Sequence, residues 1–120
     1  GKYLHSCAKK KIAMRSGNTD KAEIIFSKKI SGFAKKLSMC LKHVGIIDVD
    51  CIYYKNDLHI LDINPRIGGG YPFIHEFGFN YIEKIIQILK GKKYKSFSDK
   101  NLSKKKIFSM GTTVYSYYKQ

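Results

Sequence analysis

The most regular run of apolar residues lies in the first half of the chain, between Lys28 and His43. Its apolar positions recur three or four residues apart, which is the spacing of one face of an α-helix. Ser27 stands where an N-cap residue belongs, and Gly45 follows as a C-cap candidate. We therefore predict a helix over residues 28–43, whose apolar face consists of Ile30, Phe33, Ala34, Leu37 and Leu41.

A β-hairpin is predicted directly after this helix. Val44–Tyr54 is rich in β-branched residues and alternates between apolar and polar positions, and Leu58–Asn64 alternates again until Pro65 stops it. Residues 55–57 separate the two strands as a turn. The other predicted elements are strands at Lys11–Arg15 and Ala22–Phe26, a short helix from Pro72, a helix from a capping box at Asn80 and Glu83 to Gly91, a basic surface loop over Lys92–Lys106 and a last strand at Ile107–Tyr118.

This order of elements favours an α+β fold, in which an antiparallel β-sheet has helices packed on one face. The 120 residues, of which 43% are hydrophobic, are enough for one small domain over positions 1–120. No stretch approaches the roughly 18 uninterrupted apolar residues of a membrane span, and no signal-type segment is found. We expect a soluble, cytoplasmic protein with no membrane partner. Three dispersed cysteines without a CxxC pattern indicate neither a disulfide framework nor a zinc site.

The chain is strongly basic, with 23 Lys and Arg residues against 9 Asp and Glu and a net charge of +14. Such a balance implies attraction to a polyanion, for which nucleotide phosphates and nucleic acid are both candidates. A solvated lysine-rich surface explains the same composition equally well. Tyr115, Tyr117 and Tyr118 lie near lysines and could stack on bases, so a nucleic-acid-binding module stays the alternative that we favour less.

The predicted hairpin carries the candidate chemistry. If its turn has three residues centred on Asn56, Asp50 faces Asp62 and Asp48 faces Asn64, and these polar side chains emerge on one face. A two-residue turn would shift the register and undo this pairing. Two carboxylates directly opposite each other repel unless something offsets their charge.

A hard divalent cation would offset that repulsion. Magnesium prefers oxygen ligands and typically takes one or two protein carboxylates together with substrate phosphates. Asp50, Asp62 and the amide oxygen of Asn64 could supply such ligands. The alternatives are a raised pKa in one aspartate or simple exposure of both to water.

The segment after the hairpin strengthens this interpretation. Arg66 could hold a metal-bound phosphate, and Gly68–Gly70 would let the backbone approach a ligand closely. The competing interpretation is that Arg66 pairs with Glu76 and that the glycines only form a tight turn before a helix.

The residues from Asp62 to Pro72, DINPRIGGGYP, resemble the acidic-x-Asn-Pro-Arg-x-Gly-Gly signature of ATP-grasp enzymes, closest to the carbamoyl phosphate synthase large-chain type. Arg15–Ala22 resembles the strand and turn before the central helix of that family, and Gly78–Asn80 resembles its Gly-x-Asn helix start. The resemblance covers nearly the whole chain.

The resemblance implies a role for each matching position. Asp50, Asp62 and Asn64 would be ligands of Mg²⁺, with Mn²⁺ as an alternative, and Arg66 would contact the transferring phosphate of ATP or the acylphosphate as the catalytic residue. Lys11 and Arg15 are weaker candidates for phosphate contacts. In such enzymes ATP phosphorylates a carboxylate substrate, and an amine or another nucleophile then attacks the acylphosphate.

The chain also departs from the family pattern. Asp62 stands where the family usually has Glu, so the metal would sit closer to the strand or bind with a changed geometry. The sequence has neither a glycine-rich phosphate-covering loop nor an adenine-binding hinge, which precede this region in complete members. We expect a fragment that needs the remainder of an ATP-grasp enzyme and is inactive alone. A non-catalytic remnant of the fold is left open.

Overall fold

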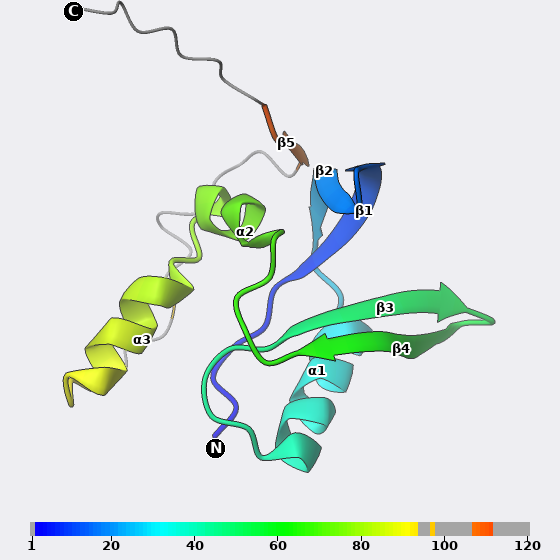
Figure 1. Ribbon diagram of the computed structural model, residues 1–120. Helices are drawn as coiled ribbons and strands as arrows, with labels where there is room; N and C mark the ends of the chain where they lie inside the picture. Colours follow the sequence, from blue (N-terminus) through cyan, green and yellow to red (C-terminus); the bar gives the residue numbers. More distant parts are fainter. Residues whose placement is uncertain (1, 94–96, 98–106, 112–120) are drawn as a thin grey trace, which may run out of the picture.

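The structure is a computed structural model that describes residues 2–93, 97 and 107–111. In these residues the chain forms two antiparallel sheets and three helices, which confirms the predicted α+β class (Figure 1). The elements are β1 (Ala8–Arg15), β2 (Asn18–Ile25), α1 (Lys28–Leu41), β3 (Asp48–Tyr54), β4 (Asp57–Asn64), α2 (Tyr71–Phe77), α3 (Tyr81–Leu89) and β5 (Ile107–Ser109).

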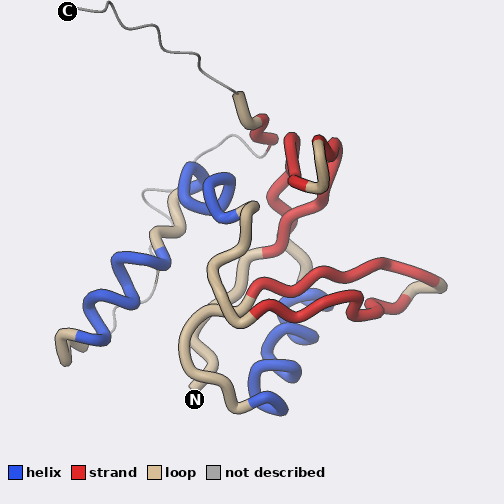
Figure 2. The backbone as a smooth tube through the Cα atoms, viewed as in Figure 1, coloured by secondary structure: helices blue, strands red, loops and turns tan. Residues whose placement is uncertain are grey.

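The first sheet has the strand order β1-β2-β5, and β3 and β4 form a separate two-stranded sheet (Figure 2). β1 begins three residues before the predicted strand, so it includes the basic residues Lys9 and Lys10. A two-residue turn joins β1 to β2, with φ of 49° at Ser16 and 80° at Gly17. Of the predicted last strand, Ile107–Ser109 pairs with β2, and positions 112–118 lie outside the described residues, as does most of the predicted loop over residues 92–106.

The β3–β4 hairpin reaches the predicted pairing by a different route. Its turn contains two residues, Lys55 and Asn56, both with positive φ (46° and 65°), so the predicted three-residue turn is wrong. Such φ values match the right-handed twist of the flanking strands and favour a two-residue turn. The register then shifts between Asp50 and Cys51, which leaves Leu61 as an extra residue in β4. This β-bulge places Asp50 opposite Asp62.

The start of α1 is as predicted and its end is not. The Ser27 hydroxyl accepts a hydrogen bond from the Ile30 amide at 3.4 Å, which makes Ser27 the N-cap. The helix ends at Leu41 because Lys42 takes a left-handed conformation (φ 50°) and donates its amide to the Ser38 carbonyl. The prediction of Gly45 as C-cap is therefore wrong. β3 also begins four residues later than predicted, at Asp48.

Of the two later helices, α2 begins at Tyr71, one residue before the predicted Pro72, and α3 begins after Asn80 as predicted. α2 carries Pro72 in its first turn, where the missing amide hydrogen is not needed. At the start of α3, the Asn80 side-chain oxygen accepts a hydrogen bond from the Glu83 amide at 3.0 Å. The Asn80 amide nitrogen in turn lies 3.4 Å from a Glu83 carboxylate oxygen, so the two ends of the predicted capping box contact each other.

The buried core of the described residues is small and lies between β2, α2 and the turn after α2. It consists of Ala22, Ile24, Phe73, Ile74, Phe77 and Phe79. No residue of α1 or α3 is buried, although each helix has an apolar face. These faces line a cavity of about 1870 Å³, together with the N-terminal segment and the β3–β4 hairpin. Within the described residues, no helix has the length and apolar character needed to cross a bilayer.

Candidate functional site

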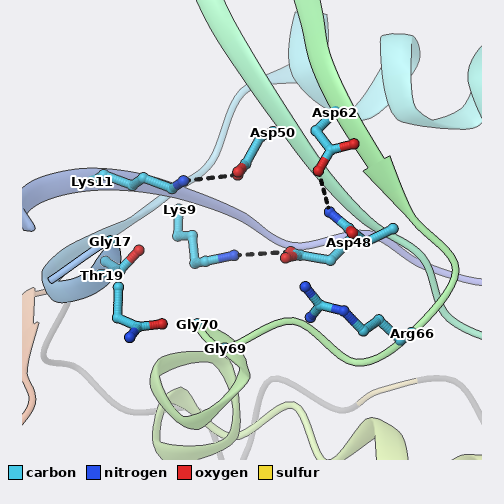
Figure 3. Close-up of a pocket in the computed structure, with 12 residues that line it drawn as sticks. Lys9, Lys11, Gly17, Thr19, Asp48, Asp50, Asp62, Arg66, Gly69 and Gly70 are labelled. Carbon is cyan, nitrogen blue, oxygen red and sulfur yellow. Dashed lines mark hydrogen bonds and ion pairs between the residues drawn. The ribbon is translucent and has the colours of Figure 1, made fainter.

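A polar pocket of about 170 Å³ lies where β1, the β3–β4 hairpin and the glycine-rich loop Gly68–Gly70 meet (Figure 3). It collects basic residues of β1 and the charged residues of the hairpin and the loop that follows it, two parts of the chain that are far apart in the sequence. Its lining residues are Lys9, Lys11, Gly17, Asn18, Thr19, Asp48, Asp50, Asp62, Asn64, Arg66, Gly69 and Gly70. Five of the six predicted site residues are therefore brought together.

The acidic side of the pocket comes from the hairpin. Asp50 and Asp62 are directly opposite each other across β3 and β4, as are Asp48 and Asn64. Asp62 accepts hydrogen bonds from the Ile63 amide at 2.9 Å and from the Asn64 side-chain nitrogen at 2.7 Å. These two bonds position the Asp62 carboxylate and orient the Asn64 side-chain amide. Because the Asn64 nitrogen donates to Asp62, the Asn64 oxygen is the atom available to bind a cation. The bulge at Leu61 immediately precedes Asp62, in a position where bulges commonly re-aim a side chain.

The basic side of the pocket comes from β1, whose alternate residues Lys9 and Lys11 point to the same face of the strand. The Lys9 ammonium lies 3.3 Å from an Asp48 oxygen, and the Lys11 ammonium lies 2.9 Å from an Asp50 oxygen (Figure 3). The two ion pairs connect the first sheet to the second, because β1 and β3 belong to different sheets.

The glycine-rich loop is packed against the Lys9–Asp48 pair. A Cβ atom added at Gly68 would overlap the Asp48 carboxylate, and one added at Gly70 would overlap the end of the Lys9 side chain. At Gly69 the nearest atom, the Asn18 side-chain oxygen, would be 3.6 Å from an added Cβ, which is an ordinary contact. The sequence predicts that these glycines admit a ligand. In the structure, Gly68 and Gly70 leave room for neighbouring side chains, and the approach of a ligand stays a prediction.

Arg66 stands at the pocket edge just after β4, with its guanidinium directed toward the pocket in Figure 3. Its Nη1 donates a hydrogen bond to the Ile67 carbonyl at 3.1 Å, and its backbone amide donates to the Asn64 carbonyl at 2.8 Å. Both contacts are local: the backbone bond places Arg66 relative to Asn64, and the guanidinium bond ties the side chain to the next residue. Among the ion pairs of the described residues, none joins Arg66 to Glu76, the competing interpretation of this arginine.

Arg15 is the one predicted site residue that the structure does not bring into the pocket. It lies at the end of β1, where its guanidinium is 3.6 Å from an Asp20 oxygen and its side chain is 71% exposed. Its predicted phosphate contact stays a prediction.

Sequence reasoning missed Lys9, Asn18 and Thr19 as members of the site, and it noted Asp48 only as the partner of Asn64. Lys9 carried a usable signal, because it precedes Lys11 by two residues and a strand places such residues on one face. Asn18 and Thr19 had no such signal, since only the fold brings the β1–β2 turn to the glycine loop.

The pocket has the donor chemistry for a hard cation. No group of three or more His, Cys, Asp or Glu side chains in the described part of the chain is arranged to hold a metal by itself. Magnesium usually takes one or two carboxylates and completes its shell with water and phosphate oxygens. Asp50, Asp62 and the Asn64 oxygen fit this description. Next to them, burial and the charge of Asp50 raise the pKa of the Cys51 thiol, so Cys51 stays protonated beside the carboxylates.

An α+β domain in which paired carboxylates face lysines, an arginine and a glycine-rich loop is suited to binding a phosphorylated ligand with its metal. Comparison with known families agrees. The chain matches a family model described as an ATP-grasp domain over residues 2–70, more than half of its length, and it belongs to that family. The match ends at Gly70 and contains every residue that lines the small pocket. The protein is thus an ATP-binding module of ligase type.

Proposed function

We propose that this chain supplies the magnesium- and phosphate-binding part of an ATP-grasp carboxylate ligase of the carbamoyl phosphate synthase type. One observation carries the proposal: Asp50 and Asp62 are directly opposite across the β3–β4 hairpin and line one pocket with Arg66. In this proposal Asp50, Asp62 and Asn64 hold Mg²⁺ or Mn²⁺. The metal would neutralise phosphate charge and orient the γ-phosphate of ATP.

Arg66 is the proposed catalytic residue. A guanidinium at the pocket edge can donate two parallel hydrogen bonds to phosphate oxygens, and it stabilises negative charge that develops as the phosphoryl group moves. The phosphoryl acceptor is a carboxylate substrate, and an amine or another nucleophile would displace phosphate from the acylphosphate. Catalysis of phosphoryl transfer depends mainly on positioning of the reactants and on stabilisation of charge, which these side chains can provide.

The size of the pocket sets which part of ATP it would hold. Its volume of about 170 Å³ is below the roughly 300–1,000 Å³ of a pocket for a whole small ligand. The pocket would therefore hold the metal and the phosphates but not the nucleoside. The larger cavity shares Lys11, Asp50 and Asp62 with it, so the nucleoside would extend in that direction. The remainder of the ligase is the proposed partner that covers this nucleoside end.

The test is a titration of the ligase that contains this chain with Mg²⁺ and a non-hydrolysable ATP analogue, in the wild type and in an Asp62→Asn variant. We expect the variant to lose at least about tenfold in affinity, because it removes a carboxylate ligand and leaves Asp50 as the one acidic group of that cross-strand pair. Asp57→Asn is the matched control, since Asp57 lies in the same strand and is exposed near the hairpin turn. Equal affinities in the wild type and Asp62→Asn would refute the proposal.

A further inference from the structure

The two lysine–aspartate pairs of the pocket differ in how firmly they are held. In the Lys9–Asp48 pair the side chains are 12% and 23% exposed, and Gly68 and Gly70 lie against them. In the Lys11–Asp50 pair the side chains are 38% and 36% exposed. Contacts from the glycine loop therefore hold the first pair in place, whereas the second pair can exchange with solvent ions.

The exposed pair involves a carboxylate that the proposed metal would need. The Lys11 ammonium lies 2.9 Å from Asp50 Oδ1, so it occupies one side of a proposed ligand. A divalent cation between Asp50 and Asp62 would repel this ammonium, and both cations compete for the same carboxylate. Holding a metal alone would therefore weaken the pair of Asp50 with Lys11, whose ammonium would turn toward water.

A nucleotide changes this balance, because it brings phosphate oxygens into a pocket whose wall includes Lys11. An ammonium that has left Asp50 can then pair with phosphate instead of water, as lysine commonly does in phosphate sites. Lys9 has no such freedom, because its stem is packed against Gly70 and its ammonium is held at Asp48.

We propose that Lys11 is an exchangeable counter-ion that couples metal binding to nucleotide binding, an inference that rests on the proposed function. Without ligands it neutralises Asp50 and weakens metal binding. With metal and nucleotide together it moves to the phosphates. The two ligands then bind cooperatively, and by linkage each raises the affinity for the other by the same factor. Lys9 keeps Asp48 in place throughout.

The test measures Mn²⁺ binding to the full chain by electron paramagnetic resonance, with and without the ATP analogue. In the wild type we expect the analogue to raise Mn²⁺ affinity at least tenfold. In Lys11→Met, Mn²⁺ alone should bind about 3- to 10-fold more tightly, because its competitor is gone, and the enhancement by the analogue should be smaller than in the wild type, with the remainder due to direct contacts between the metal and phosphate. Lys11→Arg keeps the positive charge and should restore weak binding of Mn²⁺ alone.

Lys10→Met is the matched control, because Lys10 directly precedes Lys11 in β1, is exposed and does not line the small pocket. It should behave as the wild type. The inference is overturned if Lys11→Met leaves the affinity for Mn²⁺ alone unchanged or lowers it while Asp62→Asn still weakens nucleotide binding. That pattern would keep the proposed function and remove the exchange. If Asp62→Asn instead binds the nucleotide as tightly as the wild type, both the proposed function and the exchange of Lys11 are refuted.

Discussion

At the scale of single residues, Gly68 has a specific reason to lack a side chain. The space that its Cβ would fill holds the Asp48 carboxylate, which is paired with Lys9. A short aspartate side chain attached to a strand cannot move far, so a methyl group at position 68 must displace either the loop or the ion pair.

Gly68→Ala is therefore expected to lower the free energy of unfolding by about 1–3 kcal/mol, the usual cost of overpacking. It should also weaken binding of the metal and ATP analogue. Thermal and urea unfolding followed by circular dichroism measures the first effect. Gly69→Ala is the control, because its added Cβ would make only an ordinary contact at 3.6 Å. If both variants unfold alike, the close approach of Gly68 to Asp48 does not matter for stability.

At the scale of elements, the β-bulge determines which residues of the hairpin face each other. The two-residue turn alone would pair Asp50 with Leu61, and the extra residue in β4 shifts the pairing by one so that Asp50 faces Asp62. Deleting Leu61 should join the two registers into one continuous ladder without separating the carboxylates.

The Leu61 deletion is thus expected to keep affinity for metal and ATP analogue within about threefold of the wild type. Deleting Ile52 from the opposite strand should cost at least about tenfold, because it increases the mismatch between the strands and moves Asp50 away from Asp62. Calorimetric titration of folded variants checks both values. Loss of binding in the Leu61 deletion, with the hairpin intact, would show that the bulge has a further role at the site.

Local patterns predicted the hairpin, both helix N-caps and the facing of Asp50 and Asp62. The last prediction was correct although the turn was wrong, because a two-residue turn plus one bulged residue gives the same offset as a three-residue turn. The alternation of apolar and polar residues reveals neither the φ values at the turn nor the presence of an unpaired residue in a strand. The partners of Lys9 and Lys11 could not be predicted either, because they come from a strand about 40 residues away and only tertiary structure brings the two together.

At the scale of the whole molecule, an aromatic cluster holds the N-terminal segment against α3. The His5 ring lies 4.7 Å from the Phe79 ring and 4.9 Å from the Phe97 ring, and its Nδ1 is 2.5 Å from the Tyr81 hydroxyl. Burial in this cluster lowers the pKa of His5 below its ordinary value of 6.5. At pH values between the pKa of His5 in the folded state and its ordinary pKa of 6.5 in the unfolded state, the folded state therefore binds fewer protons.

Stability should accordingly fall as the pH is lowered from 6.5 toward the folded pKa of His5, because unfolding then takes up a proton. Melting temperatures between pH 7.5 and 5 measure this effect. His5→Phe should flatten the dependence over that range, whereas His59→Gln, at an exposed position of β4, should leave it as in the wild type. An unchanged profile in His5→Phe would assign the acid sensitivity to other groups.

The bulge also affects how this chain should be aligned with its relatives. Counting outward from the hairpin tip assigns the aliphatic Leu61 as the neighbour of Asp50, whereas counting back from Asn-Pro-Arg assigns Asp62. Ligand roles transferred between homologues by loop position would thus be off by one wherever the turn length differs. The Asn-Pro-Arg end of the second strand is the safer reference point for such transfers.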